Sequence, residues 1–383
     1  MTKDSNKVAV AMSGGVDSAV AAALLQKAGY EVTGFFMYFW HDERACQREN
    51  RCCSSESEQK VRVVAKQLSI PFYTLDFKDQ FKQAVVDEFI VGYKDHITPN
   101  PCVVCNREIK FGLLLDKVRE LGFDYLATGH YVILTNSSLP RSLQTFPEES
   151  SQSSLGKNEL VKHQLFKAKD ADKDQSYFLY NLQQDQLKHL LFPVGKYTKD
   201  EVRKIARELD LPVAASKESQ DLCFVDDSVD NFLVRNLGAG KEGLIVDKDG
   251  RELGKHHGLQ AYTIGQRKGI KIGGSGPYYV LDRDFASNAL IVTSDKQDKG
   301  LYSAVVSFSE ASWVSGREPS LPLVSEAVVR YNTKPVEAKI VEQDGEIYRA
   351  QLEIPQRAVM PGQSIVFYQG DELIGGGIIK KVN

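Results

Sequence analysis

The first segment with residue types suited to chemistry is Ser13-Gly-Gly-Val-Asp-Ser18, between an apolar run and an Ala-rich stretch. Two glycines let a backbone approach an anion closely, and the amides that open the following helix can donate to it. The segment lacks the lysine of a Walker A loop, so it does not predict transfer of the terminal phosphate. Asp17 could hold a Mg²⁺ ion that bridges phosphates. The alternative is a plain Gly-Gly turn in which Ser18 caps a helix.

The second group of candidates is a set of thiols. Cys102 and Cys105 stand in a proline-marked loop that leads into a predicted helix, with Arg107 and Lys110 close behind. A helix N-terminus and basic neighbours predict a lowered thiol pKa. Cys223 is distant in sequence, but one thiol that carries sulfane sulfur and a second that attacks it form a complete sulfur relay.

Three other interpretations of the cysteines remain open. Cys-x-x-Cys could be half of a zinc site, although the chain has no second such pair. Cys102, Cys105 and Cys223 could hold an iron–sulfur cluster with one open iron. All six cysteines could also be inert thiols. No role is predicted for the remaining three, which are Cys46, Cys52 and Cys53.

The elements that must position these residues alternate between strand and helix. Apolar runs at 8–12, 32–39, 72–77 and 125–131 predict strands, and helical patterns cover 18–29, 55–68, 79–93 and 107–121. This alternation predicts an α/β domain with a doubly wound parallel sheet, whose ligands bind at the carboxyl ends of the strands.

The rest of the chain has a different pattern. Residues 136–159 are serine-rich and predict a flexible insertion between two strands of a hairpin. Residues 196–209 predict a basic helix. Short alternating segments separated by Gly turns follow from residue 243, and the last hundred residues predict a small all-β barrel or sandwich. The predicted domains are therefore 1–222, 223–290 (a small central domain) and 291–383.

Composition limits the function classes. The net charge of −3 gives no global basic footprint, so nucleic-acid binding would need local basic patches. One candidate patch is the predicted helix with Lys196, Lys199, Arg203, Lys204 and Arg207. No apolar run is long enough to span a membrane and residues 1–7 are polar, which predicts a cytoplasmic enzyme without a membrane partner.

Taken together, the motifs resemble known proteins. The phosphate loop resembles the PP-loop of the ATP-pyrophosphatase superfamily, which cleaves ATP between its α- and β-phosphates. The combination resembles the MnmA (TrmU) family of tRNA-specific 2-thiouridylases from about Val8 to the C-terminus. The other strings that carry this resemblance are Thr98-Pro-Asn-Pro-Cys-x-x-Cys-Asn106, Ala127-Thr-Gly-His-Tyr131, Lys173-Asp-Gln-Ser-Tyr-Phe178, Glu218-Ser-Gln-Asp-Leu-Cys-Phe224, Tyr262-Thr-Ile-Gly-Gln-Arg-Lys-Gly269, Pro361-Gly-Gln363 and Gly375-Gly-Gly-Ile-Ile379.

The resemblance implies a three-domain enzyme: a PP-loop catalytic domain, a central domain and a tRNA-binding β-barrel. It implies that the C2 oxygen of the wobble uridine is adenylated with ATP and Mg²⁺, releasing pyrophosphate and later AMP. Cys223 would receive sulfur as a persulfide from a donor protein. Cys105 would help to deliver it while forming a disulfide with Cys223. The implied nucleotide site contains Ala11, Met12, Ser13, Gly14, Gly15, Val16, Asp17 and Ser18, with Met37 and Gly129 near the adenine.

The same resemblance implies contacts with tRNA, whose usual acceptors in the family read Lys, Glu and Gln codons. Extraction of the base before chemistry is consistent with a pocket for it. The residues implied are Asn100, Pro101 and Cys102 around the flipped base, and Lys173, Asp174, Gln175, Arg330 and Tyr331 on the rest of the tRNA. Some members have an aspartate at the position of Cys102, where it has been assigned as a base. Here a thiol stands in its place.

Two other functions remain as alternatives. An amidotransferase-type synthetase would attach nitrogen instead of sulfur and would need neither Cys105 nor Cys223. A noncatalytic RNA-binding protein would retain tRNA affinity without consuming ATP, and the intact Ser13–Ser18 string argues against it.

Overall fold

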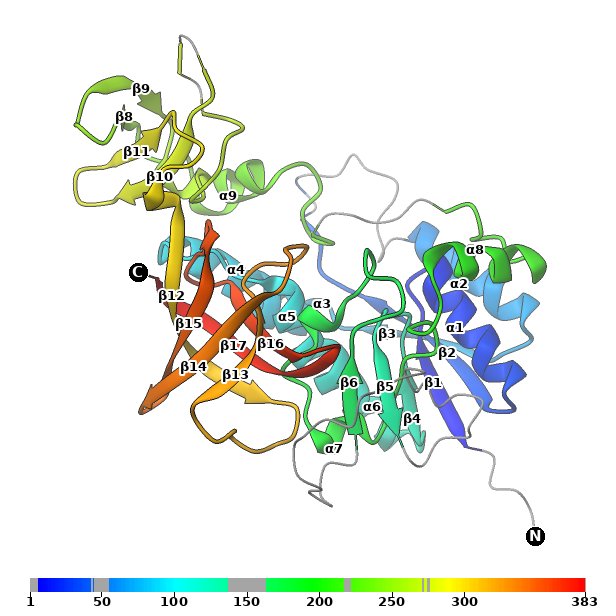
Figure 1. Ribbon diagram of the computed structural model, residues 1–383. Helices are drawn as coiled ribbons and strands as arrows, with labels where there is room; N and C mark the ends of the chain where they lie inside the picture. The colour runs from blue at the N-terminus through cyan, green and yellow to red at the C-terminus, as the bar shows by residue number, and fades with distance from the viewer. Residues whose placement is uncertain are drawn as a thin grey trace.

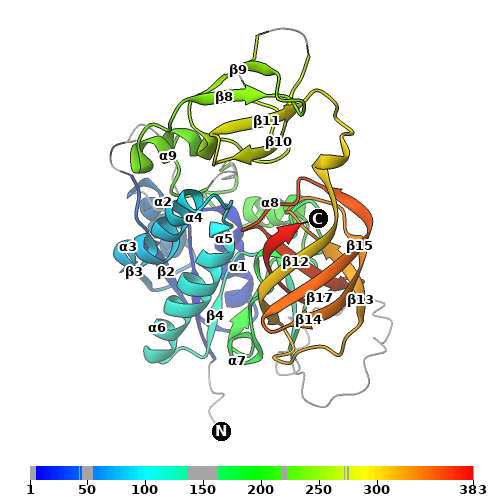
Figure 2. The ribbon, with the colours of Figure 1, turned by 90° about the vertical axis from the view of Figure 1, so that its left-hand side faces the viewer.

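The computed structural model describes residues 6–42, 44, 55–136, 163–216, 222–270, 272–273 and 276–382. Figures 1 and 2 show three bodies: an N-terminal α/β domain, a small central domain above it, and a C-terminal β-barrel beside it. The predicted fold class is confirmed by this arrangement. None of the helices in these described ranges is long and apolar enough to cross a bilayer.

The N-terminal domain is built on a parallel sheet of five strands in the order β3-β2-β1-β4-β7. Alternate residues of β1 point to opposite faces, so Ala9 packs into one apolar cluster while Val8 and Val10 pack into the other. Burial on both faces explains the continuous apolar runs in the sequence. The strands are β1 (Lys7–Ala11), β2 (Glu31–Tyr38), β3 (Phe72–Asp76), β4 (Tyr125–Ala127) and β7 (Leu190–Leu191).

Helices cover both faces of this sheet (Figure 1). One face packs against α1 (Val16–Lys27), α2 (Ser55–Gln67) and α8 (Lys199–Glu208). The other face packs against two longer helical segments. These are α3 (Lys78–Phe81) continued by η2 (Lys82–Asp87) and α4 (Glu88–Lys94), and α5 (Pro101–Val104) continued by η3 (Cys105–Leu114) and α6 (Leu115–Glu120).

The second of these segments differs from the sequence prediction. The helix predicted to begin near Arg107 begins at Pro101, because proline is well suited to the first helical position, where its missing N–H is not needed. Cys102 and Cys105 therefore lie on the first turns of a helix rather than in a loop before it. A π-helical stretch starts at Cys105, and such stretches are frequent at functional sites.

The predicted hairpin around the serine-rich insertion is present. Strand β5 (Ile133–Asn136) pairs antiparallel with β6 (His163–Phe166), while the insertion itself lies outside the described residues. Strand β6 also pairs with β17 of the barrel, which joins the first and last domains. Short elements follow the hairpin: η4 (Ser176–Phe178), α7 (Gln184–Leu187) and α8, which begins at Lys199 because Thr198 and Glu201 form a capping box.

The central domain is a four-stranded sheet, in the order β10-β11-β8-β9, with helix α9 beside it. Its core is small and includes Ile245, Val280 and Leu290. The elements are α9 (Val229–Leu237), β8 (Gly243–Val246), β9 (Glu252–His256), η5 (Leu259–Ala261), β10 (Tyr279–Asp284) and β11 (Ala289–Thr293).

The C-terminal domain is an antiparallel barrel that is closed by pairing of β12 with β17. Both closing strands escaped prediction, because β12 carries several serines and β17 carries three consecutive glycines. A side chain at Gly375 would collide with the Ser312 carbonyl of β12, so the glycine permits this closure. After η6 (Lys299–Leu301), the strands are β12 (Tyr302–Trp313), β13 (Leu323–Val328), β14 (Val336–Asp344), β15 (Ile347–Arg357), β16 (Ser364–Gln369) and β17 (Glu372–Val382).

Candidate functional site

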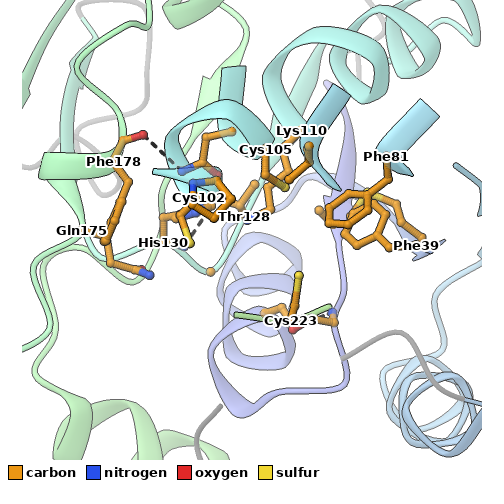
Figure 3. A pocket seen from close by; sticks show the side chains of 18 of the residues that line it. Phe39, Phe81, Cys102, Cys105, Lys110, Thr128, His130, Gln175, Phe178 and Cys223 are labelled. Atoms are coloured by element: carbon orange, nitrogen blue, oxygen red, sulfur yellow. Dashed lines mark hydrogen bonds between the residues drawn. The ribbon is translucent and has the colours of Figure 1, made fainter. Parts of the chain in front are cut away.

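The main candidate site is a cavity of about 350 Å³ at the carboxyl ends of β1, β2 and β4 (Figure 3). This is where a doubly wound sheet places its ligands. Residues from seven separate stretches of the chain, from 11–18 to 222–224, meet there. The lining residues include Ala11, Met12, Ser13, Asp17, Ser18, Met37, Phe39, Phe81, Pro101, Cys102, Cys105, Asn106, Lys110, Thr128, Gly129, His130, Gln175, Phe178, Leu222, Cys223 and Phe224.

Side-chain hydrogen bonds within the phosphate loop fix its shape. Gly15 is the extended residue that precedes α1, so Ser18 is not the helix cap. The Ser18 hydroxyl donates to the Gly15 carbonyl at 3.1 Å and accepts from the Ser13 amide at 3.2 Å. Gly14 has φ +79° and lies against the Ser57 carbonyl of α2, which a side chain would crowd. The loop is thus a preformed concave backbone at the N-terminus of a helix, as anion binding requires.

Asp17, in the first turn of α1, accepts several hydrogen bonds. The Tyr131 hydroxyl donates to its Oδ1 at 2.7 Å. The Lys199 ammonium contacts both Oδ1 and Oδ2 at 2.8 Å. An oxygen-only carboxylate beside a phosphate-binding loop is a suitable Mg²⁺ ligand, so Asp17 fits the ion expected with ATP.

Both predicted catalytic thiols line the cavity. Cys105 is buried on the helix that starts at Pro101, and Cys223 reaches the cavity from the segment after α8. In Figure 3 the Cys223 side chain points into the cavity toward that helix, and Cys102 lies nearby. The fold therefore brings together two cysteines that the sequence separates by more than a hundred residues.

The prediction of a lowered thiol pKa is wrong for the free protein. Burial raises the pKa of Cys102 to about 11 and also raises that of Cys105, while the charge of Lys110 opposes this only in part. Cys102 has exposed surface within the cavity, yet the surrounding protein still desolvates its thiol. The partial charge at the helix start is outweighed by this desolvation. Both groups are thus thiols, not thiolates, at neutral pH.

The side of the cavity where the sequence resemblance placed the adenine is lined by Met37, Thr128, Gly129 and His130. The Thr128 hydroxyl lies 2.8 Å from His130 Nδ1, and burial lowers the pKa of His130 well below its usual value, so the ring is neutral. Gly129 packs directly on the start of α1. A Cβ atom there would lie 2.7 Å from the Ser18 nitrogen and 2.8 Å from the Asp17 carbonyl carbon.

A second, wider cavity of about 890 Å³ adjoins the first and shares Ser13, Asp17, Cys102, Gln175 and Phe178 with it. It is also lined by Gly15, Val16, Tyr131, Lys173, Lys199, Asp227 and Tyr331. Tyr331 of the barrel packs on Phe178, with 4.5 Å between ring centroids. The outer cavity therefore connects the phosphate loop with the barrel.

Three of the residues implied for tRNA lie away from the two cavity walls. Asn100 lines neither cavity, and Arg330 is exposed on the barrel surface. Asp174 accepts from the Ala168 amide at 2.8 Å and from the Ser176 hydroxyl at 2.6 Å, and burial raises its pKa. Its contacts fix the loop that presents Lys173 and Gln175.

Some site residues were missed by sequence reasoning. Lys199 was assigned to a basic surface helix, but it is buried against Asp17 instead. Tyr131 was named only as the last residue of the string Ala127–Tyr131, with no predicted role of its own. The capping box of Thr198 and Glu201 was a sequence signal that α8 begins at Lys199. The direction of the Lys199 side chain, however, depends on how α8 packs beside α1.

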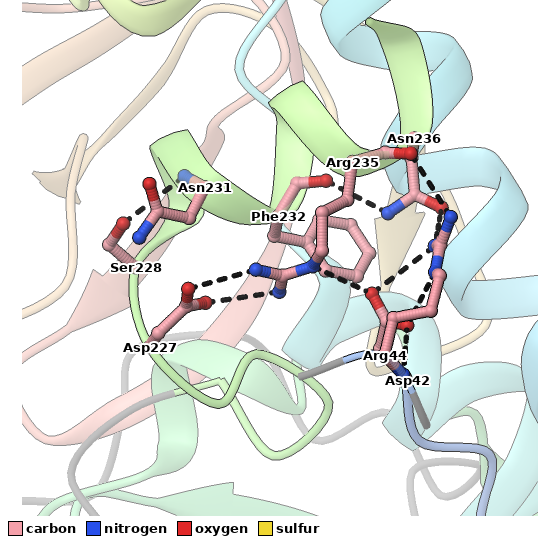
Figure 4. A network of polar contacts seen from close by, with 8 residues as sticks. All are labelled: Asp42, Arg44, Asp227, Ser228, Asn231, Phe232, Arg235 and Asn236. Atoms are coloured by element: carbon pink, nitrogen blue, oxygen red, sulfur yellow. Dashed lines mark hydrogen bonds and ion pairs between the residues drawn. The ribbon is translucent and has the colours of Figure 1, made fainter. Parts of the chain in front are cut away.

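The segment that carries Cys223 is fastened to α9 by a network of ion pairs (Figure 4). Arg235 donates to both oxygens of Asp227, at 2.8 and 3.0 Å, and to Asp42 at 3.0 Å. Burial raises the pKa of Asp42, but hydrogen bonds from Arg44 and Arg235 outweigh it and hold the pKa below its usual value. Arg235 also holds the pKa of Asp227 below its usual value.

We expect Arg235→Met to lower the free energy of unfolding at pH 7 by about 2 kcal/mol, because Asp227 loses both bonds from Arg235 and the buried Asp42 keeps only those from Arg44. Both carboxyls have a folded-state pKa below the ordinary 3.8, so the network stabilises above that pH and is lost as the pH falls below it. Urea unfolding at pH 7 and pH 3 would measure this difference. Arg251→Met, at an exposed arginine, is the control, and equal stability of Arg235→Met and wild type at pH 7 would contradict the expectation.

Over the ranges that the structure describes, no group of three or more His, Cys, Asp or Glu side chains is arranged to hold a metal ion. Cys46, Cys52 and Cys53 lie outside these ranges.

Comparison with known proteins gives matches along the whole chain. Three family models match: a tRNA methyl transferase HUP domain at residues 6–227, a tRNA methyl transferase PRC-barrel domain at 230–294, and an aminomethyltransferase β-barrel domain at 303–379. The predicted domain boundaries stay predictions.

Curated relatives are similar over nearly their full length. The tRNA-specific 2-thiouridylase MnmA of Chloroflexus aurantiacus is 44% identical over 98% of this chain and 98% of its own. The MnmA protein of Halothermothrix orenii is 43% identical over 98% of this chain and 99% of its own. That of Clostridium botulinum is 39% identical over all of both chains. On this similarity, the chain belongs to the MnmA family of tRNA-specific 2-thiouridylases.

Proposed function

We propose that this protein catalyses the ATP-dependent 2-thiolation of the wobble uridine of tRNA. One observation carries the proposal: a preformed phosphate loop and two cysteines from distant segments, Cys105 and Cys223, line the same cavity. Phosphate binding alone would fit any ATP-pyrophosphatase. Sulfur transfer through a persulfide needs two thiols in one cavity, whereas nitrogen transfer needs neither.

The first step of the proposed reaction is adenylation. ATP would bind with its adenine near Met37 and Gly129 and its phosphates on the loop from Ser13 to Ser18. When bound through Asp17, Mg²⁺ would neutralise phosphate charge. The uridine C2 oxygen attacks the α-phosphate and pyrophosphate leaves, so the oxygen departs later as AMP rather than as hydroxide.

The second step is sulfur transfer. The Cys105 thiolate attacks the Sγ atom of a Cys223 persulfide, the bond from that atom to the outer sulfur breaks, and a disulfide forms. The outer sulfur attacks C2 and AMP leaves. Two electrons from a reductant then restore both thiols. Burial raises the pKa of Cys105 in the free protein, so its thiol gives up the proton during this step, and the outer sulfur accepts that proton as it leaves as hydrosulfide.

The tRNA is proposed to approach across the barrel and the outer cavity. Pro101 and Cys102 line the inner cavity beside Cys105, which supports a position for a flipped uridine there. Lys173, Gln175 and Tyr331 line the outer cavity, where the flanking nucleotides would lie. The exposed Arg330 would contact phosphate beyond this cavity.

The test is transfer of radiolabelled sulfide sulfur into unmodified tRNA transcripts for Lys, Glu and Gln codons. We expect label only with ATP, in proportion to AMP released, and none in a matched transcript with cytidine at the wobble position. AMP release with some other acceptor and no label in tRNA would favour the amidotransferase-type alternative. Tight tRNA binding without ATP consumption would favour the noncatalytic alternative.

A further inference from the structure

We propose that Lys199 binds the β- and γ-phosphates of ATP, and that its ion pair with Asp17 is the nucleotide-free form of this contact. The Lys199 ammonium lies 2.8 Å from both Asp17 oxygens, and its side chain is only 9% exposed. A buried lysine at the edge of a phosphate loop supplies the cation that the loop sequence lacks compared with a Walker A loop. The inference depends on the proposed function in one respect only, which is that the protein binds ATP.

The position of Lys199 selects the phosphates that it can reach. The α-phosphate must lie beside the uridine and the thiols, in the inner cavity. Lys199 lines only the outer cavity, together with Gly15, Val16 and Asp17. A pyrophosphate group that leaves the α-phosphate in line with the attacking oxygen would point to this side.

Charge supports the same assignment. Among the described residues that line the outer cavity, the cationic side chains are Lys173 and Lys199. Lys199 contacts the phosphate loop through Asp17. Negative charge grows on the pyrophosphate as it leaves, and an ammonium with little access to water stabilises that charge strongly.

The stem of Lys199 is fixed while its end can turn. Its backbone amide donates to Asp170 at 2.8 Å, and the capping box of Thr198 and Glu201 holds it at the first position of α8. Mg²⁺ bound to Asp17 would repel the ammonium from the carboxylate, and the nearest anions would then be the phosphates. The four-carbon stem of a lysine is flexible, so the ammonium can turn from the carboxylate toward them.

The experiment measures binding by calorimetry, without tRNA or turnover. The probes are the non-hydrolysable analogue α,β-methylene-ATP with Mg²⁺, and AMP. For Lys199→Met we expect about 10- to 100-fold weaker binding of the analogue and less than about a 2-fold change for AMP, which lacks the outer phosphates. Lys199→Arg keeps the charge and should restore most of the affinity. Lys204→Met, at a lysine that is 71% exposed on the same helix, is the matched control and should bind like wild type.

A second measurement tests the ion pair itself. Mn²⁺ binding to the nucleotide-free protein, followed by electron paramagnetic resonance, should tighten about 10-fold in Lys199→Met because Asp17 loses its competing cation. Unchanged analogue binding by a folded Lys199→Met protein, or equal losses for AMP and the analogue, would overturn the inference. Unchanged Mn²⁺ binding would overturn the exchange at Asp17. A wild-type protein that fails to bind the analogue would contradict the nucleotide site, and thus the proposed function itself.

Discussion

Replacement of Cys105 or Cys223 by serine is expected to reduce ATP-dependent tRNA thiolation to background, a loss on the order of 10³-fold or more. Serine keeps the size of the side chain, but its hydroxyl neither carries sulfane sulfur nor cleaves a persulfide. Both thiols line the same cavity, so either loss interrupts the same relay. Radiolabel in tRNA, measured with equal enzyme and saturating ATP, checks this result.

The same variants distinguish a loss of nucleotide binding from a loss of the chemical step. Neither thiol is a phosphate ligand in the proposed site, so both serine variants should bind α,β-methylene-ATP with wild-type affinity. The comparison variant is Cys102→Ser, which removes a neighbouring thiol from the same helix but keeps a side chain of the same size in the proposed uridine pocket, and it should lose much less thiolation activity than the other two. Label that persists in Cys105→Ser would contradict the relay.

Iron analysis decides the remaining alternative. In a cluster held by Cys102, Cys105 and Cys223, all three serine variants would lose both iron and activity. A relay of two thiols predicts no stoichiometric iron in the active wild-type protein, and it predicts that Cys102→Ser differs clearly from the other two variants.

The second large effect is expected for Gly129→Ala. The added methyl group would lie 2.7 to 3.0 Å from Asp17 and Ser18 atoms, and two of these three contacts are with backbone, which cannot turn away. The start of α1 must shift, and with it the phosphate loop and the Asp17 carboxylate. We expect affinity for α,β-methylene-ATP to fall on the order of 100-fold, because small misplacements of such groups are costly. Calorimetry measures this affinity.

The cost to stability should be smaller than the cost to binding. Overpacking of this kind destabilises proteins by about 1–3 kcal/mol, which urea unfolding would detect. Gly273→Ala is the control, because a Cβ atom there has no neighbour within 4 Å. Normal nucleotide binding by a folded Gly129→Ala protein would show that Gly129 does not set the loop position.

Local patterns predicted the framework of the site well. The run Val8–Met12 and the string Ser13–Ser18 follow local rules, because a buried strand needs continuous apolar residues and a phosphate loop needs glycines before a helix. The same reasoning gave a parallel sheet with its ligands at the carboxyl edge, as is found. The barrel was predicted from alternating segments, although its closing strands β12 and β17 were not, since β12 is interrupted by several serines and β17 by three consecutive glycines, which are normally depleted in strands.

The thiol pKa shows where local reasoning failed. Cys102 and Cys105 do stand near a helix start with Lys110 close by, and that pattern alone predicts thiolates. Their actual pKa is set by the protein packed around them, which raises it. Desolvation depends on every segment that packs around the thiols, so no short stretch of sequence predicts the resulting pKa.

The sequence by itself determined the kinds of chemical group this protein uses: a glycine-rich anion loop, an aspartate and a set of thiols, each recognisable because its function depends on residue type and short spacing. Only the tertiary structure decided which of them meet. Cys223 lines the same cavity as Cys105, and Lys199 contacts Asp17, through packing of segments more than a hundred residues apart. Such contacts are selected by the summed burial of whole helices and sheets, which the types of the contacting residues do not encode.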